Sequence, residues 1–396
     1  NVLLGCGIAS SVQTLFKDHN PNLKKNIVNK LYKKCFKTSI SMYQSLKEIF
    51  KEIEPDKVYI FNGRIAESWP IVCLSKKLKI DYFTYEVAQV KKGFYRIIKN
   101  QLPHLKFLNL KKTKNPKKNL KINTNEITKF IFKNKVTMKN LNFKVYANKF
   151  EKKKLPKKFN KNVKNICIFN SSIEESHSIK GLKVNIYKDS NNAIFKIVNN
   201  FKNREDIFFY LRVHPNIGKT GPASIDFSSQ LKEIISNCKK IKNLKIIWPE
   251  EKIDSYELLK NCEKVISFGS TIGFEASYLG KPVISINNKK GHKLNYAYFP
   301  KNHRHCLNLI TKKLKPKPQI GSIEFFNYLL NSGVKYKNVS VKNNNYYFKK
   351  KKIAPNNFLI IKHKILNFIL HLFKFEYNFL YKIKQNYLFK KLFIYY

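Results

Sequence analysis

The sequence has few acidic residues, no CxxC pair and no long uninterrupted apolar run. Its 7 cysteines are scattered, and an odd number suits a reducing compartment better than a disulfide framework. No stretch reaches the ~18 consecutive apolar residues that are typical of a membrane-spanning helix, and no signal peptide is evident in the sequence shown. These absences argue against a disulfide-rich secreted scaffold and predict a protein without a transmembrane helix.

Two common nucleotide-binding signatures are also absent. Neither the dinucleotide fingerprint GxGxxG nor the P-loop sequence occurs, which disfavours a nicotinamide dehydrogenase and a P-loop kinase. No DxD motif or His-rich cluster indicates an obligatory metal. We therefore expect neither a metal nor another cofactor, and the charge of a leaving group would be met by side chains and helix dipoles.

Because acids are scarce, the formal net charge is +53, from 78 Lys plus Arg against 25 Asp plus Glu. Such a charge is typical of nucleic-acid binding. However, the excess is almost all Lys, spread along the whole chain with much Asn and Ile, a pattern that an A·T-rich genome also produces. Lys is the poorer residue for bidentate recognition of phosphates or bases. A basic nucleic-acid-binding protein is kept as an alternative, with nucleic acid the less favoured partner.

Apolar strands alternate with amphipathic helices in both halves of the 396 residues. In the first half we predict strands at residues 2–4, 57–61 and 80–85, helices at 25–53 and 127–149, and a helix that ends at 78. In the second half we predict strands at residues 166–169, 207–213, 244–248, 264–268 and 283–286, and helices at 192–203, 228–238, 254–261 and 272–278. The segments predicted as loops are a basic loop at 89–101, a surface loop at 111–125 and a linker at 152–161.

This alternation predicts an α/β protein of two doubly wound, Rossmann-like domains with an interdomain cleft. We expect the domains at residues 1–150 and 151–334, followed by a basic aromatic tail at residues 335–396. The sequence opens on Asn1 and an apolar run, so we also expect that a preceding strand has been lost.

The stretch KVISFGSTIGFEASYLGKPVI, residues 264–284, combines a strand, a turn of small residues, a helix and a second strand. This is a βαβ unit of a parallel sheet, and its turn lies where open α/β sheets bind ligands. Ser270 and Thr271 would place hydroxyl and N–H groups at a helix N-terminus, which suits a phosphate. Glu275 would reach a ribose hydroxyl. The same residue types also serve as ordinary helix caps and dipole partners.

Polar residues follow four consecutive strands of the second half, and parallel strands bring such ends to one edge of a sheet. The four ends are Ser171-Ser172, His214-Pro215, Pro249-Glu250 and Gly269-Ser270-Thr271. His214 would donate a hydrogen bond, or carry positive charge, toward a phosphate leaving group, and Arg212 points to the same side of its strand. A lone His at a strand end is more often a satisfied surface residue, but four polar ends in one sheet predict a site.

The sequence LRVHPN at residues 211–216, followed by VISFGSTIGFEASYLGKPVI at 265–284, resembles two motifs of GT-B glycosyltransferases in the capsule polysaccharide biosynthesis group. These are the His-Pro motif and the Ser-Thr/Glu-Ala motif. YIFNGRIAESWP and YFTYEVAQVKKG extend the resemblance over about residues 57–284. The group includes Kdo-type and sialic-acid-type transferases, with teichoic-acid glycerophosphotransferases as relatives. The Asp/Glu-Asp-Gly signature of the sialyl branch is not evident.

The resemblance implies a GT-B fold in which the N-terminal domain binds the acceptor and the C-terminal domain binds the activated donor. By this resemblance His214, Ser270 and Thr271 would hold the donor phosphate, and the backbone near Trp248 and Pro249 would hold the base. The implied activity is transfer of a sugar from a nucleotide-activated donor to a surface-polysaccharide or lipid-linked glycan acceptor. A CDP-glycerol-type glycerophosphotransferase is the alternative within this class.

Arg64 and Glu86 follow two strands of the first half and are the candidates for the acceptor side. Sugar transfer with inversion needs a base near the acceptor hydroxyl, and a carboxylate serves. We predict Glu86 as that base, with Arg64 holding an anion or orienting the carboxylate. A purely structural Arg64–Glu86 ion pair is the alternative. Glu174 and Glu175 form a second acidic pair to consider.

Residues 335–396 contain many Lys, interleaved aromatic and aliphatic residues and one acid, Glu376. A helix there would suit the headgroup region of an anionic membrane. A helix docked on the N-terminal domain and an RNA-contacting segment are the lower-ranked alternatives. We therefore expect a bacterial, cytoplasmic protein bound peripherally to the inner face of the cell membrane.

Overall fold

The computed structural model describes residues 4–88, 90, 93–103, 124–134, 151–174, 177–179, 186–215, 217, 228–286, 292–342 and 345–353. The chain forms two compact units, Asn1–Lys335 and Tyr336–Tyr396, and each is described by itself. Among the described residues, no helix has the length and apolar character needed to cross a membrane.

A five-stranded sheet forms the centre of the second half of unit Asn1–Lys335, in the order β6-β5-β4-β7-β8. Its strands are β4 (Lys164–Phe169), β5 (Ile207–Arg212), β6 (Leu244–Ile247), β7 (Lys264–Ser267) and β8 (Val283–Ser285). All four pairings are parallel. The chain builds outward from β4 to β6 and then continues on the other side of β4, so the order reverses between β4 and β7. Such a reversal is a topological switch point.

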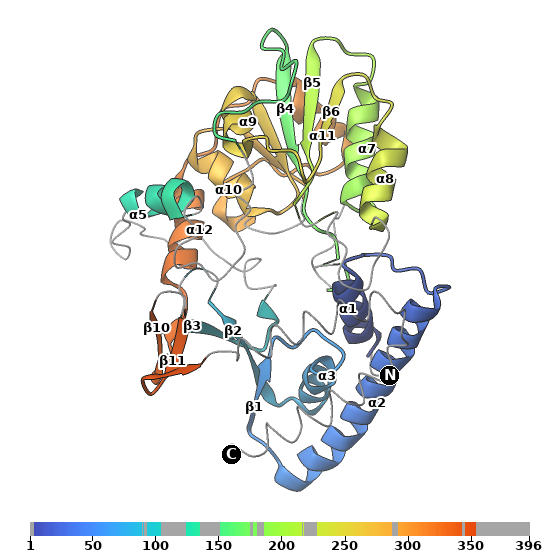
Figure 1. Cartoon of the computed structure of the whole chain (residues 1–396), viewed down its shortest axis with the longest axis vertical. Helices are drawn as coiled ribbons and strands as arrows, with labels where there is room; N and C mark the ends of the chain where they lie inside the picture. The colour runs from blue at the N-terminus through green and yellow to red at the C-terminus, as the bar shows by residue number, and fades with distance from the viewer. Residues whose placement is uncertain are drawn as a thin grey trace. The chain divides into compact units, whose positions relative to one another are not determined.

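Helices cover both faces of this sheet (Figure 1). One face packs against α7 (Ser190–Asn200), α8 (Ser229–Cys238) and α11 (His303–Thr311). The other face packs against α5 (Thr124–Thr128), a π-helical turn (Lys129–Asn134), α9 (Ser255–Asn261), α10 (Thr271–Tyr278) and α12 (Ile320–Asn331). The sheet is therefore the middle layer of three.

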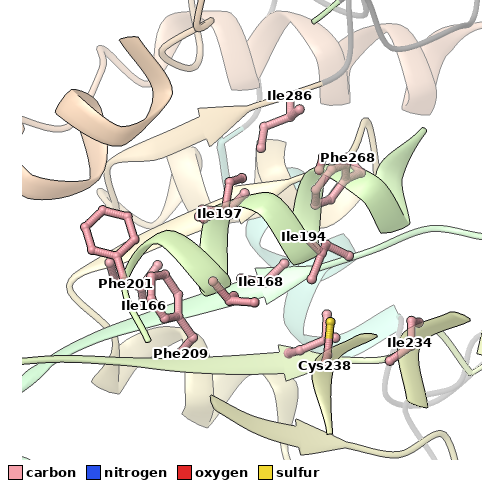
Figure 2. Close-up of a cluster of buried hydrophobic side chains, with 14 of the residues drawn as sticks. Ile166, Ile168, Ile194, Ile197, Phe201, Phe209, Ile234, Cys238, Phe268 and Ile286 are labelled. Atoms are coloured by element: carbon pink, nitrogen blue, oxygen red, sulfur yellow. The ribbon is translucent and has the colours of Figure 1, made fainter. Parts of the chain in front are cut away.

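Alternate side chains of β4 show why the sheet is buried on both sides. Ile166 and Ile168 belong to the cluster on the α7 face, where they lie near Ile194 of α7 (Figure 2). Cys167 and Phe169 belong to the cluster on the opposite face. A strand with two buried faces has a continuous apolar run, as ICIF does here.

Three strands of the first half and one from the end of the same unit form a four-stranded sheet in the order β1-β2-β3-β9. Its strands are β1 (Lys57–Phe61), β2 (Asp81–Val87), β3 (Phe94–Lys99) and β9 (Val334–Lys335). Strands β1 and β2 are parallel, whereas the β2–β3 and β3–β9 pairs are antiparallel. The helices of this half are α1 (Gly5–Phe16), α2 (Asn26–Ile53) and α3 (Trp69–Leu78).

This sheet buries one face and exposes the other in the described part of the chain. Ile60 of β1 and Tyr82 of β2 pack with Val72 of α3. On the opposite face Phe61 and Tyr85 form a T-shaped ring pair and stay exposed. The sheet therefore has a covered side toward α3 and an open aromatic side.

The second unit begins with a small antiparallel sheet in the order β10-β11-β12. Its strands are β10 (Val339–Lys342), β11 (Asn345–Phe348) and β12 (Lys351–Ile353). The predicted membrane-binding segment falls largely on residues 354–396, which lie outside the described residues.

The α/β class predicted from the alternation is confirmed, and the two halves have separate sheets. The strands predicted at 57–61 and 80–85 are parallel neighbours. The predicted basic loop at 89–101 is wrong, because residues 94–99 form β3. The segment FYRIIK alternates in burial and pairs along β2, and this pairing outweighs its Lys and Arg content.

Several other predicted elements lie partly outside the described residues. Of the strand predicted at residues 2–4 only Leu4 is described, and it is the residue before α1, so the glycines after it begin a helix. Of the helix predicted at residues 127–149, residues 127–134 are helical, and residues 135–149 lie outside the described residues. The greater part of the predicted surface loop, residues 111–123, is outside as well.

Candidate functional site

The carboxyl ends of β4, β5, β6 and β7 meet on one edge of the five-stranded sheet and are joined by hydrogen bonds. The Ser171 hydroxyl after β4 donates to the carbonyl of Phe268 after β7, at 2.8 Å. The Ser172 hydroxyl lies 3.4 Å from Nδ1 of His214, which follows β5. On the other side of β5, Arg212 donates to the carbonyl of Trp248 after β6. The expected convergence of these strand ends is confirmed.

The turn from β7 into α10 leaves the start of this helix without a side-chain cap. Gly269 has φ +72°, a backbone conformation that glycine adopts without the cost of a Cβ. Ser270 occupies the N-cap position but makes no capping hydrogen bond. Gly273 lets the helix approach the strand closely, since a Cβ there would lie 2.6 Å from Oγ of Ser267. The first-turn N–H groups of α10 are therefore presented at the edge of the sheet.

His214 is held at this edge by two contacts from the loop after β4. Its backbone N–H donates to Oδ1 of Asn170 at 2.8 Å, and its ring contacts Ser172. Burial, with a smaller contribution from the positive charge of Arg212, lowers the pKa of His214 to about 4. The imidazole is therefore neutral near pH 7. This lowered pKa favours a neutral hydrogen-bonding group over a positive charge, and contact of His214 with a phosphate stays a prediction.

The loop that carries the two serines is itself held by Gln230 of α8. The side-chain amide of Gln230 donates to the carbonyl of Ser171 at 2.9 Å and accepts the N–H of Ile173 at 3.1 Å. Gln230 is 2% exposed, so both ends of a buried amide are satisfied within the fold. At the first turn of the same helix, Ser229 donates its N–H and its hydroxyl to Oδ2 of Asp18, in the segment after α1.

The side chain of Glu275 is buried, with 1% of its surface exposed. One carboxylate oxygen accepts the hydroxyl of Tyr256 in α9 at 2.6 Å. Burial and then the negative charge of Glu275 raise the pKa of that hydroxyl well above its ordinary value. This bond ties α9 to α10. The predicted contact of Glu275 with a ribose hydroxyl stays a prediction.

Glu86 lies inside β2, opposite Arg96 of β3 in the antiparallel register. Arg96 forms an ion pair with Oε2 of Glu86 at 3.6 Å, and the amide of Asn62 donates to Oε1. Burial raises the pKa of Glu86, while Arg96, Asn62 and, least, Arg64 act in the opposite direction. A partly buried carboxylate with a raised pKa is typical of a general base.

Arg64 contacts α1 and also lowers the pKa of Glu86 slightly, so the Arg64–Glu86 ion pair stays a prediction. The guanidinium of Arg64 donates to the hydroxyls of Ser10 and Thr14 in α1, at 2.8 and 3.1 Å. Asn62, which has φ +59°, donates its side-chain amide to Glu86. Arg96 and Asn62 hold the carboxylate in its place. A role of Arg64 in holding an anion stays a prediction.

The second acidic pair is only partly described. Glu174 is buried after β4, and Glu175 lies outside the described residues. Within the described ranges, no three His, Cys, Asp or Glu side chains gather closely enough to hold a metal ion. The expectation of a metal-free and cofactor-free reaction stays a prediction.

Four residues that shape these two sites were not named as site residues from the sequence: Asn62, Arg96, Asn170 and Gln230. Asn62 and Asn170 each follow a predicted strand, and that signal was available. Arg96 was missed because its strand was interpreted as a loop. Gln230 lies in a helix about 60 residues from the loop that it holds, and no local pattern indicates such a contact.

Residues 101–288, just under half of the chain, match the family described as capsule polysaccharide biosynthesis protein. This segment is similar to that family. It contains the His-Pro and Ser-Thr/Glu-Ala motifs and the whole carboxyl edge described above. The family resemblance drawn from those motifs is confirmed.

Solved structures with a similar arrangement include two transferases and an epimerase. The Thermosulfurimonas dismutans KpsC beta Kdo 2,7 transferase has 12% identity, a TM-score of 0.40 and coverage of 81% of this chain and 89% of that chain. The beta Kdo 2,4 transferase of the same organism has 11% identity, a TM-score of 0.38 and coverage of 68% and 78%. The UDP-GlcNAc 2-epimerase from Neisseria meningitidis has 14% identity, a TM-score of 0.30 and coverage of 74% and 80%. Comparison with curated protein sequences gives no match.

Proposed function

We propose that the protein is a GT-B glycosyltransferase that moves a sugar from a nucleotide-activated donor to a surface-polysaccharide or lipid-linked glycan acceptor. Residues 151–334 would bind the donor, and residues 1–150 would form the acceptor side. The match of residues 101–288 to the capsule family supports the class. The observation that carries the proposal is the polar carboxyl edge at the switch point of the five-stranded sheet, where open α/β sheets bind ligands.

The donor phosphate is proposed to lie at the start of α10. Ser270 and Thr271 present N–H and hydroxyl groups there, and the positive end of the helix dipole favours an anion. His214 and Arg212 come from β5, which lies on the other side of β4 from β7. Trp248 and Pro249 follow β6 and would contact the base. A neutral His214 would donate a hydrogen bond to the phosphoryl oxygen as negative charge develops on the leaving group.

Glu86 is proposed as the general base. In a direct displacement, the acceptor hydroxyl oxygen bonds to the anomeric carbon while its proton passes to the carboxylate of Glu86. The bond from the anomeric carbon to the phosphate oxygen breaks, and the nucleotide leaves with the electron pair. The raised pKa of Glu86 brings its basicity closer to that needed near neutral pH.

The tail is proposed to bind an anionic membrane surface, where lipid-linked acceptors would be met. The support is its composition, since residues 335–396 combine many Lys with interleaved aromatic and aliphatic residues. Removal of residues 353–396 should release the protein from vesicles that contain anionic lipid. A shortened chain that still sediments with those vesicles would rule the tail out as the anchor.

The decisive experiment is incubation of the purified full chain with CMP-, UDP- and GDP-linked sugars and CDP-glycerol, with release of the nucleotide as the readout. Turnover of one nucleotide sugar is the expected result. Turnover of CDP-glycerol alone would identify a glycerophosphotransferase. No turnover, together with salt-dependent binding of RNA, would favour the basic nucleic-acid-binding alternative. His214→Ala is the matched site variant and should reduce turnover while the protein stays folded.

A further inference from the structure

Asn170 is the first residue after β4, the central strand of the five-stranded sheet, and its side chain is 2% exposed. Its Oδ1 accepts the backbone N–H of His214 at 2.8 Å. Only the oxygen of an amide side chain can accept that N–H, so the bond fixes the orientation of the group. The other end of the side chain, Nδ2, is therefore a hydrogen-bond donor of known identity.

Nδ2 of Asn170 has no hydrogen-bond partner among the described residues. Buried donors without a partner are rare and costly. Gln230, an equally buried amide that holds the same loop, uses both of its ends within the fold. Nε of Arg212, on the neighbouring strand β5, is also buried and has no hydrogen-bond partner in the described part of the chain.

The register of the sheet places Asn170 beside the start of α10. Phe169, the residue before it, pairs with Ser267 of β7 on one side and Arg212 of β5 on the other. The next residue, Ser171, donates to the carbonyl of Phe268, two residues before Ser270. Asn170 thus lies at the switch point, between His214 and the uncapped first turn of α10. A free amide N–H and a helix N-terminus both favour a negatively charged oxygen.

We propose that Asn170 is a ligand-binding residue whose Nδ2 donates to a phosphoryl oxygen of the nucleotide-activated donor. The inference rests on the proposed function and adds a residue to its donor site. Asn170 then has two roles, because its oxygen positions His214 and its nitrogen binds the phosphate. An amide suits this place since it donates at any pH and brings no charge into a buried position.

Asn170→Asp separates the two roles. The substitution keeps the shape and the oxygen that accepts the His214 N–H, and it replaces the donor with a second oxygen. Isothermal titration calorimetry with CMP, UDP, GDP and CDP, and with the corresponding nucleosides, measures the effect. We expect the Kd of the nucleotide that the unaltered protein binds to rise at least 10-fold, with the Kd of its nucleoside unchanged. Asn170→Ser removes the amide without adding charge and should also weaken nucleotide binding.

Asn165→Asp is the matched control. Asn165 is a buried Asn at the other end of β4, where its Nδ2 donates to the carbonyl of Asn160. This variant should lose some stability but bind the nucleotide as the unaltered protein does. Thermal unfolding of all three variants establishes that they are folded.

Three outcomes would overturn the inference while leaving the proposed function in place. The first is an unchanged nucleotide Kd in Asn170→Asp. The second is an unchanged nucleotide Kd in Asn170→Ser although Asn170→Asp binds the nucleotide more weakly. The third is an equal rise of the Kd for nucleotide and for nucleoside. The first would show that Nδ2 of Asn170 does not contact the phosphate. The second would show that the added negative charge alone weakens binding. The third would show that the substitution disturbs the whole site. Failure of the unaltered protein to bind any of the nucleotides would overturn the function and the inference together.

Discussion

The two sheets of the first unit use the same α/β chemistry in different ways. The five-stranded sheet is parallel throughout and buried on both faces, so its strands are apolar and its polar groups stand after the strands. The four-stranded sheet is mixed and has one open face in the described residues, and its charged pair Glu86–Arg96 lies within the strands. The difference teaches where to look for chemistry. In the four-stranded sheet the pair lies on the covered face, beside the buried Thr84 and Ile98, and Glu86 is one residue before the end of β2.

The largest expected effect is the loss of turnover when Glu86 of the four-stranded sheet is replaced. Glu86→Gln keeps the side-chain shape and removes the base, so kcat should fall about 100- to 10,000-fold while donor binding persists. Because burial raises the pKa of Glu86, activity of the unaltered enzyme should rise with pH above the usual range of a glutamate. Initial rates across pH measure both effects.

The control for this prediction is Asp81→Asn. Asp81 is the carboxyl group at the other end of β2, where it pairs with Lys99. Its loss should leave kcat unchanged. Near-normal turnover by Glu86→Gln would remove Glu86 from the mechanism and direct attention to Glu174.

The second effect concerns the covered and open faces. Phe209 of β5 is 0% exposed, whereas Phe61 of β1 is 56% exposed. Phe209→Ala should lower the free energy of unfolding by about 3–5 kcal/mol, because it removes a core ring and leaves a cavity. Phe61→Ala should change it by less than about 0.5 kcal/mol. Urea denaturation of both variants gives the comparison, and equal losses would show that the first sheet is covered on both faces in solution.

The third effect is on the pH dependence of stability, through His214 at the carboxyl edge of the five-stranded sheet. His214 stays neutral in the folded protein until pH about 4, but protonates near ~6.5 in the unfolded chain. The unfolded state therefore binds more protons between these values, and stability should be lost as pH falls from ~6.5 to about 4. His214→Gln should show a shallower loss over this window. Parallel curves of urea midpoint against pH for the two proteins would contradict burial of a neutral imidazole.

The smallest effect concerns the contact that joins the two regions. Asp18 accepts the N–H and the hydroxyl of Ser229 at the start of α8. Asp18→Ala should cost about 1 kcal/mol of stability, as the loss of a helix N-cap does. Asp18→Asn keeps an accepting oxygen and should cost less. Hydrogen exchange in the first turn of α8 measures the change locally, and unchanged protection in Asp18→Ala would mean that the contact contributes nothing.

The sequence determined the parallel sheet and the edge where its polar strand ends meet. A short apolar run such as ICIF is typical of a strand buried on two faces, and parallel strands end on one edge of a sheet. His214, Ser171 and the turn at Ser270 were found from that rule alone. The rule works because the spacing of strands and crossover helices is a local property of the chain.

Only the tertiary structure decided which side chains meet. Arg96 faces Glu86 because β3 pairs antiparallel with β2, and the sequence of β3 does not specify its partner strand or register. Arg64 contacts Ser10 and Thr14 of α1, which lie at least 50 residues earlier in the chain. Gln230 reaches Ser171 from a helix distant in sequence. Such contacts depend on packing between elements, and packing is a property of the folded chain as a whole.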